Sequence, residues 1–158
     1  MTGQLVLNLF IAFLWTLFSG DMSVPTFTFG YLVGVGIVFL MHRFFGDRFY
    51  LVRVWASIKL IFLFLNETFQ SFFWVARFIL NPKAIYRPGI FRYETKLETD
   101  WEITIISMLI TLTPGSVVMD VSPDRKYIYL HGMDLTGQNE VLLSSLDKYE
   151  KAIMEVTR

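Results

Sequence analysis

Residues 4–41, QLVLNLFIAFLWTLFSGDMSVPTFTFGYLVGVGIVFLM, decide the fold of this chain. Two apolar runs, 4–20 and 26–41, flank the helix-breaking stretch SGDMSVP, and neither run contains a charged side chain. A helical hairpin buried in a soluble core is the alternative, but the remaining chain is too small to wrap two helices that are apolar on every side. The sequence therefore predicts a first domain, residues 1–45, that is a transmembrane helical hairpin with spans at about 4–20 and 26–42.

The composition of the whole chain agrees with a membrane-associated protein. Of its 158 residues 54% are hydrophobic, 17% are aromatic and only 18% are charged, whereas a soluble domain has about 25% charged residues. This richness in aromatic residues excludes a disordered chain and argues against a free soluble enzyme. With no cysteine and two histidines, the chain offers little for a metal site, so we expect no metal and no cofactor.

Charge is segregated along the chain. Residues 1–41 contain one acid, Asp21, and no Lys or Arg; residues 42–96 contain nine basic and three acidic residues, and residues 97–158 contain five basic and ten acidic residues. The basic residues follow the second apolar run, and the turn at 20–26 has none, so the positive-inside rule predicts that both termini are cytoplasmic. We expect a multi-pass membrane protein whose basic middle part is attracted to anionic lipid and not to nucleic acid.

The third apolar segment, 54–80, has a different pattern. Lys59, Asn66, Gln70 and Arg77 form one polar stripe of a helix, and Glu67 lies beside that stripe. Both ends of the segment are basic, which favours an amphipathic helix that lies along the inner membrane interface or on a partner's flank. A third spanning helix is the alternative. We assign residues 46–88 to this helix and a linker.

Residues 89–158 change to the pattern of a small α/β domain. We expect a capping box at Thr99 and Glu102, and a final helix from Thr136 with a solvated face that includes Glu150. The expected elements are a strand at 90–97, a helix at 99–112, strands at 117–121 and 127–133, and the final helix. This β-α-β-β-α order predicts a cytoplasmic domain resembling a ferredoxin-like fold that lacks its last strand.

Few residues of this sequence are candidates for a functional site, and we expect no catalytic residue. Glu67 is the one acid in an apolar setting, so it is either a relay carboxylate or a polar-stripe residue paired with Lys59 or a neighbour. Gly30 and Gly34 have the small-xxx-small spacing that lets another helix approach closely, although glycine is common in spanning helices in any case.

The stretch 106–116, ISMLITLTPGS, resembles the "LITLTPGT" motif of the E-type subunits of multisubunit Na⁺/H⁺ antiporters, of the Mrp or Mnh type. The following VMDVSPD at 118–124 and YIYLHGMD at 127–134 are similar to the same family's "VDVSPD…LYVHALD" hairpin. The resemblance covers essentially the whole chain. Ser116 stands where the family has Thr, and Gly132-Met133 where it has Ala-Leu.

The resemblance implies an accessory, non-catalytic subunit of a cation/proton antiporter complex in the bacterial inner membrane, required for assembly or full activity. Its implied partners are the other subunits, including large ones that resemble the antiporter-like subunits of respiratory complex I, and membrane lipid. Residues 4–41 agree with an accessory role, because they contain almost no ionisable group that could carry ions through a membrane. A free-standing membrane-anchored binding module and a membrane enzyme are the alternatives.

Overall fold

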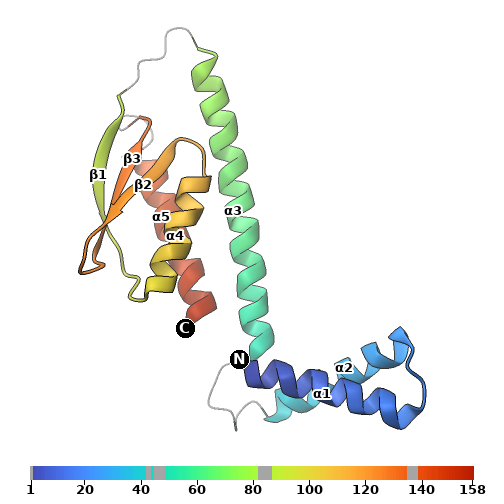
Figure 1. Ribbon diagram of the computed structural model, residues 1–158. Helices are drawn as coiled ribbons and strands as arrows, with labels where there is room; N and C mark the ends of the chain where they lie inside the picture. The colour runs from blue at the N-terminus through green and yellow to red at the C-terminus, as the bar shows by residue number, and fades with distance from the viewer. Residues whose placement is uncertain (1, 42–43, 45–48, 82–86, 135–138) are drawn as a thin grey trace. The chain divides into compact units, whose positions relative to one another are not determined.

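The computed structural model describes residues 2–41, 44, 49–81, 87–134 and 139–158 (Figure 1). Its helices and strands are α1 (Thr2–Ser19), α2 (Val24–Met41), α3 (Tyr50–Ile79), β1 (Gly89–Glu94), α4 (Asp100–Leu112), β2 (Ser116–Val121), β3 (Tyr127–Gly132) and α5 (Asn139–Thr157). The chain divides into two compact units, residues 1–55 and 56–158. The boundary falls inside α3, so this helix contributes to both units.

The N-terminal unit is built on α1 and α2, which pack against each other. Gly20 ends α1 in the left-handed region, at φ +66°, where glycine has no Cβ penalty. The Asp21 carboxylate then accepts hydrogen bonds from Ser23 N at 3.0 Å and Thr26 Oγ1 at 2.6 Å, which order the turn before α2. Of the described helices, α2 alone is both long and apolar enough to cross a membrane, while Gly3–Ser19 is apolar but shorter.

The C-terminal unit contains a three-stranded antiparallel sheet of order β1-β3-β2. Alternate residues of β3, Ile128 and Leu130, are fully buried beneath α4 and α5, which cover one face of the sheet (Figure 1). Ile106 of α4 and Leu146 and Ile153 of α5 complete the centre of this core. The coarse prediction of helices with a small sheet is confirmed.

One face of α3 packs on this core. Leu60, Leu63 and Phe64 lie against the buried cluster of the C-terminal unit. The helix has 30 residues, about 45 Å at the usual rise, and begins four residues before the predicted start. Its amphipathic pattern indicated lipid or a partner as the neighbour, and did not indicate that the chain's own α/β elements cover one of its faces.

The predicted capping box of α4 is confirmed. Thr99 Oγ1 accepts from Glu102 N at 3.2 Å, and Glu102 Oε2 accepts from Thr99 N at 3.1 Å. The predicted turn between β2 and β3 is also present, with Arg125 N donating to Ser122 O at 2.8 Å. The expected start of the last helix at Thr136 lies outside the described residues.

The prediction that Glu150 lies on the solvated face of the last helix is wrong. Its side chain is fully buried. Glu150 Oε1 accepts hydrogen bonds from Thr95 Oγ1 and, at 2.9 Å, from Lys96 N. The chain leaving β1 runs over α5 at this point and supplies both donors to this one oxygen of the buried carboxylate. β1 accordingly ends at Glu94, and not at the predicted Leu97.

Candidate functional site: buried polar clusters in the two units

A cluster of neutral polar side chains lies inside the N-terminal unit. Asn8 Nδ2 donates to Tyr50 Oη at 2.7 Å, the Tyr31 and Tyr50 hydroxyls are 3.0 Å apart, and Gln4 Oε1 accepts from Tyr50 N at 2.9 Å. Gln4, Asn8 and Tyr50 are almost completely buried. Because α1, α2 and the first turn of α3 each contribute, the cluster fixes the three segments together.

Gly30 and Gly34 lie where α1 crosses α2. A Cβ at Gly34 would come closer than 3.0 Å to Asn8 Oδ1 and would lie 3.2 Å from the backbone oxygen of Asn8. A Cβ at Gly30 would lie 2.7 Å from Trp15 Cβ. A Cβ at Gly36, by contrast, would meet no atom within 4 Å. The helix that approaches the two glycines closely is therefore α1 of the same chain.

Glu67 is buried between α3 and α5, with only 5% of its side chain exposed. Its Oε1 accepts from Lys148 Nζ at 2.8 Å and its Oε2 from Ser145 Oγ at 2.5 Å. Pairing with Lys59 was one of two alternatives, and it is wrong, since Lys59 pairs with Glu155 at 3.6 Å. Lys59 is two helical turns from Glu67, whereas α5 presents Lys148 directly opposite it. Both carboxylate oxygens of Glu67 are thus occupied within the C-terminal unit.

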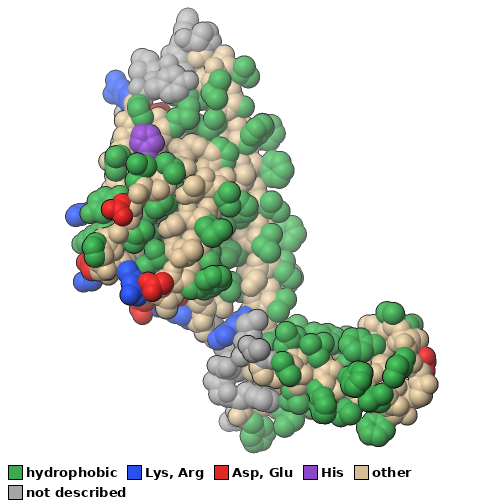
Figure 2. Space-filling view, in the orientation of Figure 1, with side chains coloured by type: hydrophobic (Ala, Val, Ile, Leu, Met, Phe, Trp, Pro, Cys, Tyr) green, Lys and Arg blue, Asp and Glu red, His purple; other side chains and the backbone are tan. Residues whose placement is uncertain are grey.

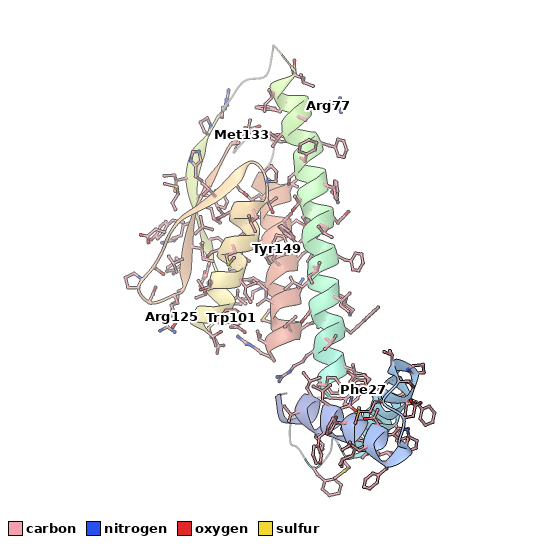
Figure 3. The ribbon with its side chains drawn as sticks, turned by 45° about the vertical axis from the view of Figure 1, so that its right-hand side comes forward. Phe27, Arg77, Trp101, Arg125, Met133 and Tyr149 are labelled. Atoms are coloured by element: carbon pink, nitrogen blue, oxygen red, sulfur yellow. The ribbon has the colours of Figure 1, made fainter. Side chains whose placement is uncertain are left out.

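A small pocket next to this ion pair is lined by the TPGS part of the motif at 113–116 together with Ser145 and Tyr149. Thr113 ends α4, with its N–H bonded to Leu109 O and Ile110 O. The Thr113 and Tyr149 hydroxyls are 3.4 Å apart, and Figure 3 places Tyr149 in the interior of the unit. Burial raises the pKa of Tyr149, and the negative charge of Glu67 raises it further, so its hydroxyl stays neutral.

The motif also has a conformational requirement at Gly115. This residue lies at φ +93°, where a side chain is strained, and its carbonyl accepts from Met133 N at 3.0 Å. Ser116 Oγ donates to Ile110 O at 3.1 Å. Thr113, Gly115 and Ser116 therefore form the connection between α4 and β2 beside the Glu67 ion pair.

Glu102 joins the start of α4 to the end of α5. Its Oε1 accepts from Thr157 Oγ1 at 2.6 Å and lies 3.5 Å from Arg158 Nε. Burial works to raise the pKa of Glu102, but the hydrogen bonds from Thr157, the backbone N–H groups of Glu98 and Thr99, and Arg158 outweigh it and lower the pKa to about 2. The carboxylate stays ionised at physiological pH and anchors the C-terminal end of the chain.

Asp120, Asp124 and His131 make local contacts in and around the β2–β3 hairpin. Asp124 accepts from Lys126 N at 3.3 Å within the turn, and Asp120 accepts from Val121 N at 2.8 Å. His131 lies on the central strand, paired with Ile90 and Val117. Among the residues that the structure describes, no three His, Asp or Glu side chains are grouped as a metal site would need.

Several of these residues were not foreseen. Gln4 and Asn8 are four residues apart on one face of an apolar helix, a spacing that could have indicated a buried polar contact. Ser145 and Lys148 had no such signal, because their position opposite Glu67 depends on how α3 packs against α5.

Comparison with known proteins identifies the family. Residues 8–156 match the sequence model of a family described as "Na+/H+ ion antiporter subunit". The chain is 43% identical over 158 residues to the E-type Na(+)/H(+) antiporter subunit of Bacillus subtilis, and 42% identical over 158 residues to that of Alkalihalophilus pseudofirmus; both alignments cover 100% of each chain. It is 40% identical to the E1-type Na(+)/H(+) antiporter subunit of Staphylococcus epidermidis, over 99% of this chain and 98% of the relative.

Two solved structures contain similar chains. One belongs to an archaeal respiratory complex, the membrane-bound sulfane sulfur reductase, with 23% identity and a TM-score of 0.55 over 97% of this chain and 99% of that chain. This likeness shows a shared fold. The other belongs to the Mrp complex of Dietzia sp. DQ12-45-1b, with 28% identity and a TM-score of 0.47 over 65% of this chain and 94% of that chain. Both the family match and the full-length relatives agree with the resemblance carried by the 106–134 motif: the chain belongs to the family of Na⁺/H⁺ ion antiporter subunits and is a bacterial membrane protein.

Proposed function

We propose that this chain is an accessory subunit of a multisubunit Na⁺/H⁺ antiporter, needed for assembly or full activity and carrying neither ions nor protons itself. The observation that carries the proposal is the state of Glu67. This is the one acid within the three N-terminal helices, because the described residues of α1 and α2 contain none. Its two oxygens are held by Ser145 and by Lys148.

Ion translocation needs polar or ionisable groups that can bind and release the ion inside the membrane. Among the described residues of the N-terminal unit, the buried polar side chains are the amides and hydroxyls of Gln4, Asn8, Thr16 and Tyr50. They suit helix packing better than ion exchange, since none of them carries a charge at neutral pH. We infer that transport takes place in other subunits, including large ones of the complex I antiporter type.

The proposal includes a membrane topology and a domain arrangement. A hairpin of α1 and α2 spans the inner membrane, both termini are cytoplasmic, α3 is an amphipathic juxtamembrane helix, and the C-terminal domain resembles a ferredoxin-like fold without its last strand. Basic residues after α2 support this orientation. The sheet order β1-β3-β2, with β1 parallel to β2, is the order expected of a split β-α-β unit.

A mild-detergent purification tests the proposal. A tag placed after Arg158 and expressed from the native locus should recover large polytopic antiporter subunits in stable proportion, identified by mass spectrometry. A folded, monodisperse chain without companions would contradict it and would favour a free-standing membrane-anchored binding module. Two reporters fused after Arg158 test the topology: one that is active only in the cytoplasm and one that is active only after export. We expect activity from the first alone, and activity from the second alone would overturn the topology.

A further inference from the structure

The long helix α3 has an uncovered apolar face. Opposite the side that packs on the C-terminal unit, a row of large side chains is exposed: Ile58, Phe62, Leu65, Phe69, Phe72 and Phe73, which we call the outer face. Phe62 and Phe73 are 68% and 66% exposed. Figure 2 shows hydrophobic side chains along this side of the helix. An apolar row of this length is too large to face water without a function.

The contacts of the opposite side show that α3 cannot cross a bilayer with this domain attached. They run from Lys59, which pairs with Glu155, through Glu67, which pairs with Lys148, to Ser71 at the pocket. These thirteen residues span about 18 Å of helix. A spanning α3 would carry the exposed charges of α5 into hydrocarbon, at a cost of several kcal/mol each.

The charges of α3 are arranged for an anionic surface. Its sequence contains Arg53, Lys59, Glu67 and Arg77 as the only ionisable side chains other than tyrosine. Glu67, the one acid, is buried and neutralised on the side of α5. Lys59 and Arg77 are exposed on the polar stripe that borders the outer face, and Figure 3 places Arg77 near the end of the helix.

We propose that the outer face of α3 lies in the anionic surface of the bilayer, parallel to it. Its aromatic side chains enter the boundary between headgroups and acyl chains, and Arg77 contacts phosphate groups of anionic lipids. The inner face then holds the α/β elements just above the membrane. This inference rests on the cytoplasmic placement in the proposed function and identifies the partner of the helix as lipid.

Site-directed spin labelling of the complete complex tests this inference, because the chain has no native cysteine. Single cysteines replace Phe62, Phe69 or Phe73, and Trp101 on α4 supplies the control, being equally exposed but on the α/β side. The labelled complexes are reconstituted into vesicles of phosphatidylethanolamine and phosphatidylglycerol. A complex with the unsubstituted chain, treated in the same way, gives the background signal from labels on the other subunits. Accessibility to oxygen and to a water-soluble nickel chelate then gives the depth of each label.

We expect the three outer-face labels to be accessible to oxygen at one similar, shallow depth, and the label at Trp101 to be accessible to the nickel chelate. Label depths that change steadily by about 16 Å between positions 62 and 73 would indicate a spanning helix. Immobile labels that are shielded from both reagents would indicate that another subunit covers the outer face. Either result overturns the inference. In phosphatidylcholine alone the labels should become more accessible to the chelate, and an unchanged profile would contradict recognition of anionic lipid. Complexes that fail to co-purify would instead count against the proposed function.

Discussion

The contact between Gly34 and Asn8 makes the packing of α1 on α2 directly testable. In Gly34→Ala the new methyl group would overlap Asn8 Oδ1, and it would lie 3.2 Å from Asn8 Cγ and from the backbone oxygen of Asn8. The amide cannot simply turn away, because its Nδ2 is hydrogen-bonded to Tyr50 Oη at 2.7 Å. The substitution therefore either separates the helices or breaks a buried hydrogen bond.

The size of the effect follows from opposing terms. Alanine is preferred to glycine in a helix by about 1 kcal/mol, whereas overpacking costs about 1–3 kcal/mol and an unsatisfied buried polar group costs about 1–3 kcal/mol. Because Gly34→Ala and Gly36→Ala gain the same helix preference, we expect Gly34→Ala to be the less stable of the two by about 1–3 kcal/mol. Gly36→Ala is the matched control: its Cβ meets no atom within 4 Å, so this variant should be neutral or slightly more stable.

The assay is thermal unfolding of the full chain in mild detergent, followed by size-exclusion chromatography of a fluorescent fusion. Asn8→Ala should recover much of the loss in the Gly34→Ala background, as expected when two residues in contact are coupled. If Gly34→Ala proves as stable as Gly36→Ala in the isolated chain, the reasoning is refuted. A loss that appears only in the assembled complex would show that another subunit, and not α1, approaches this glycine.

Three further predictions concern the C-terminal unit. The pKa of Glu102 falls from 4.5 to about 2 on folding, which stabilises the folded chain by on the order of 3 kcal/mol. This stabilisation is complete above pH 4.5 and is lost as the pH falls towards 2. Acid unfolding of Glu102→Gln should lack this pH dependence, and an acid midpoint equal to that of the unsubstituted chain would contradict the role of Glu102. Thr99→Ala removes the N-cap of α4 and should lower the free energy of unfolding by about 1 kcal/mol in urea titration, so a loss below experimental error would count against the capping box. Lys148→Met leaves Glu67 without its cation and should destabilise the chain by about 1–2 kcal/mol in thermal unfolding; the cost is moderate because the Lys148 side chain is half-exposed and partly screened. Lys151→Met is the control and should cost almost nothing, because the partner of Lys151 is exposed. Equal losses in the two variants would refute the view that the buried Glu67 depends on Lys148.

The sequence allowed the two apolar helices and the elements of the α/β part to be predicted because each has a local signal. The breaker SGDMSVP separates two uniformly apolar runs, and Thr99 with Glu102 marks the start of α4 through contacts within one turn. The ends of α1 and α2 lie within two residues of the predicted ends. These features depend on neighbours in sequence, which is why patterns detect them.

Features that depend on tertiary packing could not be predicted in the same way. Glu150 has the sequence pattern of a solvated helix residue, yet Thr95 and Lys96, more than fifty positions away in sequence, bury it and hydrogen-bond it. Glu67 stands out in the sequence as the one acid in an apolar setting, but its partners Ser145 and Lys148 are about eighty positions away. No spacing rule connects residues so distant, so only the packing of α3 on α5 reveals the pair.

The most direct test of the central claim, that this subunit carries no ions itself, is Na⁺/H⁺ antiport by everted membrane vesicles that contain the complex with Glu67→Gln. Complex abundance is measured in the same vesicles, with Lys148→Met as a second variant of the same ion pair. The account predicts antiport per assembled complex close to that of the unsubstituted chain in both variants. Loss of antiport in Glu67→Gln with normal complex abundance and normal activity of Lys148→Met would contradict it, because the carboxylate itself would then take part in transport.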